Sequence, residues 1–118
     1  MNKNQVINLD TLYEICGGEK SFIIEMIDLF LEQADSFITD IESASINNDD
    51  EIVKKKAHKF KSSAQIFGII KLYDILLSIE GSGLQDFTPL EKNNVLIEMK
   101  EISDLACDQL KEERKKYV

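Results

Sequence analysis

The chain has 118 residues, of which 43% are hydrophobic and 31% charged, as expected of one globular domain with its own core. Its net charge of −8 disfavours general binding to nucleic acid. No segment approaches the roughly 20 apolar residues of a membrane span and no signal peptide begins the chain, so we expect a cytoplasmic protein that does not insert into membranes. Cys16 and Cys107 belong to no ligand-spaced motif, which is typical of reduced thiols in a helical core.

Helical spacing of apolar residues runs through nearly the whole chain. It predicts a short helix over 9–16, ended by a pair of glycines, and a long helix over 19–44. A polar turn follows, in which an aspartate can cap a third helix over 50–69. A fourth helix is predicted over 71–80. The last begins at Thr88-Pro89, an N-cap followed by proline, and continues to about residue 116.

These elements predict an all-α fold, an antiparallel four-helix bundle with a short additional N-terminal helix. We expect a single domain over 1–118, with its core within about 9–116. The inward stripe of the long helix is predicted to contain Phe22, Met26, Leu29, Phe30, Gln33, Phe37 and Ile41.

Charge is unevenly distributed along the chain. Residues 52–73 contain six lysines and no acidic residue, which leaves a net charge of −14 on the remainder. A local basic patch on an acidic body is typical of a docking site for one acidic partner or for a phosphate.

The single histidine, His58, lies within this basic segment. At 100° per residue, the apolar face of the predicted helix lies opposite the imidazole, so His58 points away from the core. The core face contains Val53, Phe60, Ala64 and Phe67. The residues that share the face of His58 are Lys54, Lys55, Lys61, Ser62, Gln65 and Ile69.

Several functions are open to a histidine in this position. It could be merely exposed among solvated lysines. A metal site is disfavoured because there is no second histidine, and because position 55, where a bundle di-metal site needs a glutamate, is lysine. A Ser-His-Asp triad is disfavoured because the sequence has no nucleophile elbow.

Phosphoryl acceptance accounts for more of the sequence. A neutral imidazole nitrogen is a nucleophile, and Lys61, one turn further along the helix, can offset the charge of arriving phosphoryl oxygens. Ser62 and Gln65 are small or neutral donors that leave room above the ring. Because the sequence has no glycine-rich nucleotide loop and no acidic magnesium cluster, we expect no use of ATP and no autokinase activity. The phosphoryl group must then come from another protein.

Segment 57–68 has the pattern A-H-x-F-K-S-S-x4-G, which resembles the A-H-x-L-K-G-[SA]-x5-G signature of the histidine-containing phosphotransfer (Hpt) domain of two-component phosphorelays. Upstream, Gly17-Gly18-Glu19 with Phe22 and the segment LFLEQ at 29–33 is similar to the first long helix of that family. Downstream, the spacing of Leu72, Leu76 and Glu80 is also similar, so the resemblance covers about residues 9–110.

The resemblance implies roles for particular residues. His58 would carry the phosphoryl group on its outward nitrogen, Lys61 would pair with the phosphoryl oxygens, and Glu80 would hold the other ring nitrogen. Gly68 would permit a close turn beneath the site. Ser62 stands where the family usually has glycine, a position at which the partner approaches the imidazole closely.

The resemblance also implies the reaction and its partners. The chain would accept phosphate from a receiver-domain aspartyl phosphate and pass it reversibly to another receiver aspartate. Receiver domains of response regulators, or of a hybrid sensor kinase, would be the partners of a monomer without a metal or cofactor of its own, and magnesium would reside in the receiver. The docking surface is predicted at Lys54, Lys55, Ser62, Gln65 and Ile69. An alternative is a non-phosphorylated four-helix adaptor that binds a partner through the face between Lys54 and Lys61.

Overall fold

The structure is a computed structural model that describes residues 4–118, and within these residues it has five helices and no strand. The helices are α1 (Asp10–Cys16), α2 (Lys20–Ile46), α3 (Asp50–Ile66), α4 (Ile70–Ser82) and α5 (Pro89–Arg114). The predicted all-α fold is confirmed. The main difference in bounds is at the end of α3, which stops three residues before the predicted position because Gly68 turns the chain there.

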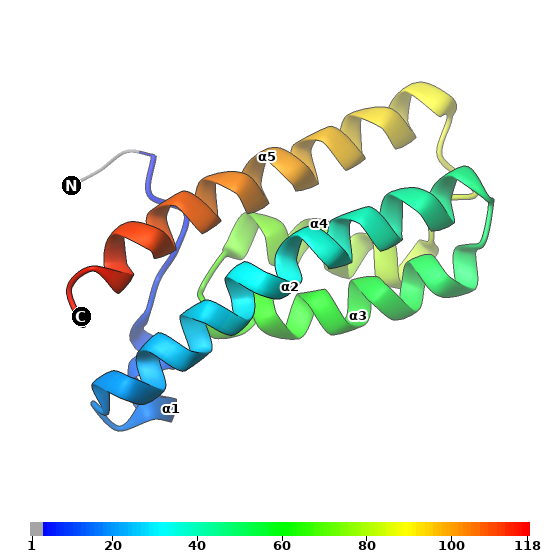
Figure 1. Ribbon diagram of the computed structural model, residues 1–118. Coiled ribbons are helices and arrows are strands. Elements are labelled where there is room, and N and C mark those ends of the chain that lie inside the picture. The colour runs from blue at the N-terminus through cyan, green and yellow to red at the C-terminus, as the bar shows by residue number, and fades with distance from the viewer. Residues whose placement is uncertain (1–3) are drawn as a thin grey trace.

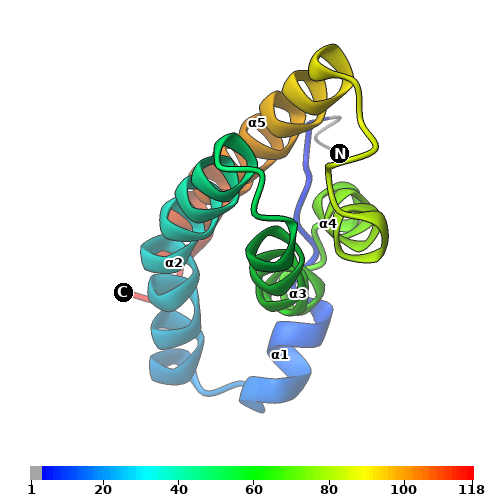
Figure 2. The same cartoon turned by 90° about the vertical axis from the view of Figure 1, so that its right-hand side faces the viewer.

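The four long helices run alternately up and down the molecule, and α1 covers one end (Figure 1). In the end-on view of Figure 2, α3 lies between α2 and α4, and α3 packs against both of these helices. The helix α5 packs against α2 and α4 on the other side. This arrangement gives α3 one face toward the core and one long face toward solvent.

Aromatic packing between α2 and α3 fixes the register of these two helices. Phe37 stacks on Phe60 with ring centroids 5.1 Å apart, and Phe30 lies 4.9 Å from Phe67. Phe30, Phe60 and Phe67 are almost completely buried. Burial of each such side chain stabilises the fold by about 1.5–3 kcal/mol, so these pairs hold α3 firmly against α2.

The predicted inward stripe of α2 is correct at Phe30 and Ile41, which are buried, and wrong at Phe22, Leu29 and Gln33, which are exposed. Phe22 and Leu29 were expected in the core but are 37% and 46% exposed, whereas their neighbours Ile23 and Phe30 are buried. Apolar residues occur in adjacent positions along α2, so two stripes about 100° apart fit the sequence nearly equally well. The buried stripe contains Ile23, Ile27, Phe30, Ala34, Ile38 and Ile41.

Side-chain caps begin α3 and α5. Asp49 accepts a hydrogen bond from the Ile52 amide, as expected of an aspartate in this turn. Thr88 and Glu91 form a reciprocal capping box before α5. In addition, Asp50 accepts from the amide of Leu84 at 2.8 Å, which ties the start of α3 to the loop between α4 and α5.

The segment before α1 crosses the turn between α3 and α4. The Asn8 amide donates to the Phe67 carbonyl at 3.0 Å, and Ile7 and Leu9 are buried on either side of it. Gly68 has a φ of +62°, and a Cβ built there would lie 2.7 Å from Asn8 Cβ and 2.9 Å from its amide nitrogen. Glycine is therefore required here both by the backbone conformation and by the close approach of Asn8.

Candidate functional site

His58 lies near the middle of α3 on its solvent-facing side. Its side chain is 63% exposed, whereas Ala57 and Phe60 on the same helix are fully buried. The prediction that the imidazole points away from the core is confirmed. The apolar face of α3 packs in the core, and this packing positions the backbone that supports the imidazole.

Glu80, in the last turn of α4, connects His58 to Lys61. Its Oε1 atom is hydrogen-bonded to His58 Nδ1, and its Oε2 atom lies 2.5 Å from Lys61 Nζ. The carboxylate and the ammonium are more enclosed than the ring, with side-chain exposures of 25% for Glu80 and 17% for Lys61. One carboxylate thus holds the histidine and the lysine at once.

The two contacts affect the protonation of Glu80 in the same direction. The hydrogen bond from Lys61, and then that from His58, lower the pKa of the Glu80 carboxyl below its ordinary value. At neutral pH the carboxylate is an acceptor only, so a neutral His58 must place its proton on Nδ1 to satisfy this contact. The Nε2 lone pair is then free and directed outward.

Lys61 was predicted to contact a phosphoryl group, and its ammonium lies beside the imidazole on the shared carboxylate. The ammonium also lies over the ring of Tyr73, 5.9 Å from the ring centroid. Neither contact was predicted from the sequence. Lys61 and Glu80 are 19 residues apart in the sequence. Their proximity becomes apparent only when the turn between α3 and α4 is known.

Comparison with known proteins identifies the fold and the family. The family model for the Hpt domain matches residues 25–113, well over half of the chain. The chain belongs to the Hpt domain family. Its role is that of a histidine phosphotransfer domain in a phosphorelay, and receiver domains are the partners of such domains.

A solved Hpt protein has the same fold. The crystal structure of histidine-containing phosphotransfer protein B (HptB) from Pseudomonas aeruginosa PAO1 superposes with a TM-score of 0.83 at 17% identity, over 96% of this chain and 97% of that one. No curated protein gives a significant sequence match.

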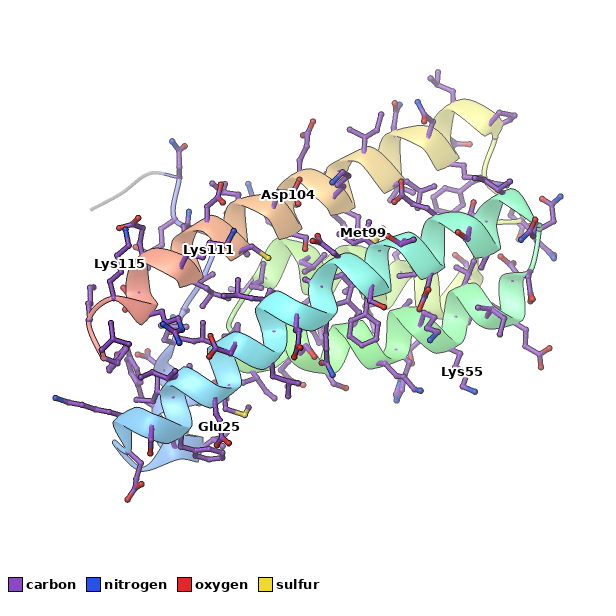
Figure 3. All side chains as sticks on the ribbon, viewed as in Figure 1. Glu25, Lys55, Met99, Asp104, Lys111 and Lys115 are labelled. Atoms are coloured by element: carbon purple, nitrogen blue, oxygen red, sulfur yellow. The ribbon has the colours of Figure 1, made fainter. Side chains whose placement is uncertain are left out.

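Four of the five predicted docking residues of this Hpt domain are accessible. Lys54, Lys55, Ser62 and Gln65 are exposed on α3. Figure 3 shows Lys55 extending from α3 away from the other helices. The Ser62 hydroxyl donates to the His58 carbonyl at 3.4 Å, so it remains close to the helix backbone.

Ile69, the fifth predicted docking residue, is fully buried, and this prediction is wrong. The helical angle assigned to Ile69 assumed that α3 continues through it. Instead, α3 ends at Ile66, and the left-handed conformation of Gly68 turns Ile69 into the core at the start of α4. The next residue, Ile70, is 69% exposed.

Among residues 4–118, no three His, Cys, Asp or Glu side chains gather in a way that could hold a metal ion. In the same part of the chain, no helix combines the length and apolar character that crossing a bilayer requires.

Proposed function

We propose that His58 is the phosphoacceptor of this Hpt domain and that the phosphoryl group binds its Nε2 atom. The observation that carries this proposal is the pairing of His58 Nδ1 with Glu80 on a ring that is 63% exposed. The carboxylate orients the ring and fixes the tautomer, and the open side of the ring is where a partner can approach.

The reaction requires no group from this chain beyond those described. The Nε2 lone pair attacks the phosphorus of a receiver aspartyl phosphate, the P–O bond to the aspartate breaks, and the carboxylate leaves. The phosphorylated ring carries a positive charge, which Glu80 stabilises while it still accepts from Nδ1–H. Transfer to a second receiver is the reverse reaction. Magnesium and the acidic pocket belong to the receiver.

Lys61 is proposed to stabilise the phosphoryl oxygens without leaving Glu80. An ammonium group has three N–H donors, and its ion pair with the Glu80 carboxylate does not require all of them. The remaining donors can turn toward Nε2-bound phosphate, because Lys61 lies one helical turn from His58 on the same side of α3. The shared carboxylate therefore keeps the lysine close before the phosphate arrives.

We further propose that the protein is a cytoplasmic monomer and that it does not use ATP. Cys16 and Cys107 are both free thiols, which suits a reducing compartment. Sedimentation equilibrium of the purified chain tests the monomer, with a mass close to 13.5 kDa as the expected result.

Incubation with receiver domains phosphorylated by acetyl phosphate tests the phosphoacceptor. We expect the wild-type chain to gain one phosphoryl group that is labile in acid and stable in base. His58→Gln should keep the fold, because the side chain faces solvent, and should gain no label. A labelled His58→Gln variant, or a label stable in acid, would refute the assignment.

A further inference from the structure

Tyr73 lies on the same side of α4 as Glu80, about two helical turns before it. The two residues are about 10 Å apart along the helix axis. Glu80 Oε2 lies 2.5 Å from Lys61 Nζ, and the centroid of the Tyr73 ring lies 5.9 Å from the same atom. The ammonium that α3 provides is therefore held between a carboxylate and an aromatic ring, both from α4.

The enclosure of Lys61 distinguishes it from its neighbours on α3. Its side chain is 17% exposed, whereas Lys54, Lys55 and Lys59 are exposed. A lysine side chain has a flexible stem of four carbons, and it loses much rotamer freedom when it is fixed in one place. The ion pair with Glu80 restrains the ammonium from one side. The aromatic ring restrains it from another.

We propose that Tyr73 is a positioning residue, which keeps the Lys61 ammonium where it meets the phosphoryl oxygens on His58. This inference rests on the proposed phosphotransfer at His58 and on the role of Lys61 in it. The face of an aromatic ring attracts a cation but carries no net charge. A second carboxylate in the place of the ring would compete with the phosphoryl group for the ammonium. The ring instead leaves the charge of Lys61 available to the phosphoryl oxygens.

The ring also limits the space around the ammonium. A hollow of about 270 Å³ lies beside the ring, where α3 turns into α4. The residues that line this hollow are Ala64, Gln65, Gly68, Ile69, Ile70 and Tyr73. Lys61 does not line the hollow, whereas the ring that it contacts does. A smaller side chain at position 73 would extend the hollow toward Lys61, so the ammonium would gain water and the freedom to move away from Glu80.

Two other roles of Tyr73 predict different results. A residue that only packs α4 against α3 is replaced at little cost by another large apolar side chain. A residue that only contacts the partner protein affects transfer from receivers and leaves the reaction with a small donor unchanged. A positioning role predicts a slower reaction with every phosphoryl donor, and an effect that requires the Lys61 ammonium.

Substitutions at position 73 separate these roles. Tyr73→Phe keeps the aromatic face, and Tyr73→Leu removes the ring but keeps an apolar side chain with high helix propensity. Tyr73→Met serves the same purpose as Tyr73→Leu if leucine disturbs the fold. The matched control is Tyr117→Leu, because Tyr117 is also half-buried but contacts Tyr13 of α1. Circular dichroism shows whether each variant is folded.

The rate of His58 labelling by phosphoramidate, a donor too small to need docking, is measured for each variant. We expect Tyr73→Leu to lower this rate about 3- to 10-fold, the effect of losing a partly desolvated contact between a cation and a ring. Tyr73→Phe should restore the wild-type rate, and Tyr117→Leu should stay within about 2-fold of it. In a chain that carries Lys61→Ala, the further change Tyr73→Leu should have no effect, since no ammonium is left to position.

The mobility of the lysine is a second readout, which does not depend on the reaction. In ¹⁵N relaxation NMR of the lysine ammonium groups, Lys61 should be more mobile in Tyr73→Leu than in the wild type or in Tyr73→Phe. The exposed ammonium of Lys59 is the internal reference and should be unchanged.

The inference and the proposed function fail on different results. If Tyr73→Leu is labelled at the wild-type rate, if it slows labelling equally in the Lys61→Ala chain, or if Tyr73→Phe is as slow, Tyr73 does not position Lys61, and phosphotransfer at His58 still stands. Unchanged mobility of Lys61 in Tyr73→Leu has the same meaning. If phosphoramidate and receivers both fail to label wild-type His58, the proposed function fails and the positioning inference fails with it.

Discussion

Substitution of Gly68 by alanine tests how the turn below the site is built. Two separate costs are expected at this position. The left-handed backbone, with φ of +62°, disfavours any residue that has a Cβ atom, and that Cβ would overlap the backbone of Asn8. Gly17 offers a matched control, since its φ is +57° and a Cβ there meets nothing within 4 Å.

The two costs have different magnitudes. Alanine in the left-handed region costs about 1–2 kcal/mol. Alanine also reduces the conformational entropy of the unfolded chain, which offsets about 0.4–1 kcal/mol of this cost. Gly17→Ala should therefore lower the free energy of unfolding by about 1 kcal/mol. Gly68→Ala must also displace the segment around Asn8. Loss of the Asn8–Phe67 hydrogen bond costs about 1 kcal/mol, and partial exposure of Ile7 and Leu9 adds about 1–2 kcal/mol.

Urea unfolding followed by circular dichroism measures both free energies of unfolding. We expect Gly68→Ala to lose about 3–4 kcal/mol, a large share of the stability of a small domain, against about 1 kcal/mol for Gly17→Ala. Equal losses at the two glycines would mean that the contact with Asn8 does not constrain position 68, and the reasoning about this turn would be refuted.

Three further predictions concern the site and the core. Lys61→Ala should slow phosphoryl transfer by about 10- to 1000-fold in stopped-flow assays, whereas Lys59→Ala should change the rate little. Equal losses of rate would indicate that the two lysines only attract the partner electrostatically, and that Lys61 does not contact the phosphoryl group. Ser62→Arg should block transfer from a receiver by steric overlap and leave phosphoramidate labelling intact, so an unchanged receiver rate would exclude docking at this face. Ser103 is buried and its hydroxyl has no hydrogen-bond partner among residues 4–118. Ser103→Ala should therefore raise the free energy of unfolding by about 1 kcal/mol, and a loss of stability in thermal melts would contradict this.

Much of the fold could be predicted because residues typical of helix starts mark where the helices begin. Thr88 and Pro89 begin α5, and Asp49 caps α3, as these residue types do in most helices. The inward stripe of α2 was predicted correctly at Phe30 and Ile41 but wrongly at Phe22 and Leu29, each of which is next to a buried apolar residue. In such a helix the choice between two faces is made by packing against the neighbouring helices, which the sequence of α2 alone does not contain.

Spacing within α3 predicted the position of His58, whereas across the α3–α4 turn only the contact of Glu80 with His58 was expected, and that from the family resemblance. The outward position of His58 follows from the apolar face of α3. The burial of Ile69 follows instead from the conformation of Gly68, beyond which helical angles no longer apply. The contact of Lys61 with Glu80, and the position of Tyr73 beneath it, arise from the pairing of two helices.

The most direct test of the central claim is the position of the phosphorus on the imidazole. The wild-type chain, labelled with ¹⁵N at histidine and phosphorylated with phosphoramidate, is examined by ¹⁵N and ³¹P NMR. We predict phosphorus on Nε2 of His58, with the Nδ1 proton protected from exchange by its bond to Glu80 and less protected in Glu80→Ala. Phosphorus on Nδ1, the nitrogen that the carboxylate holds, would contradict the account.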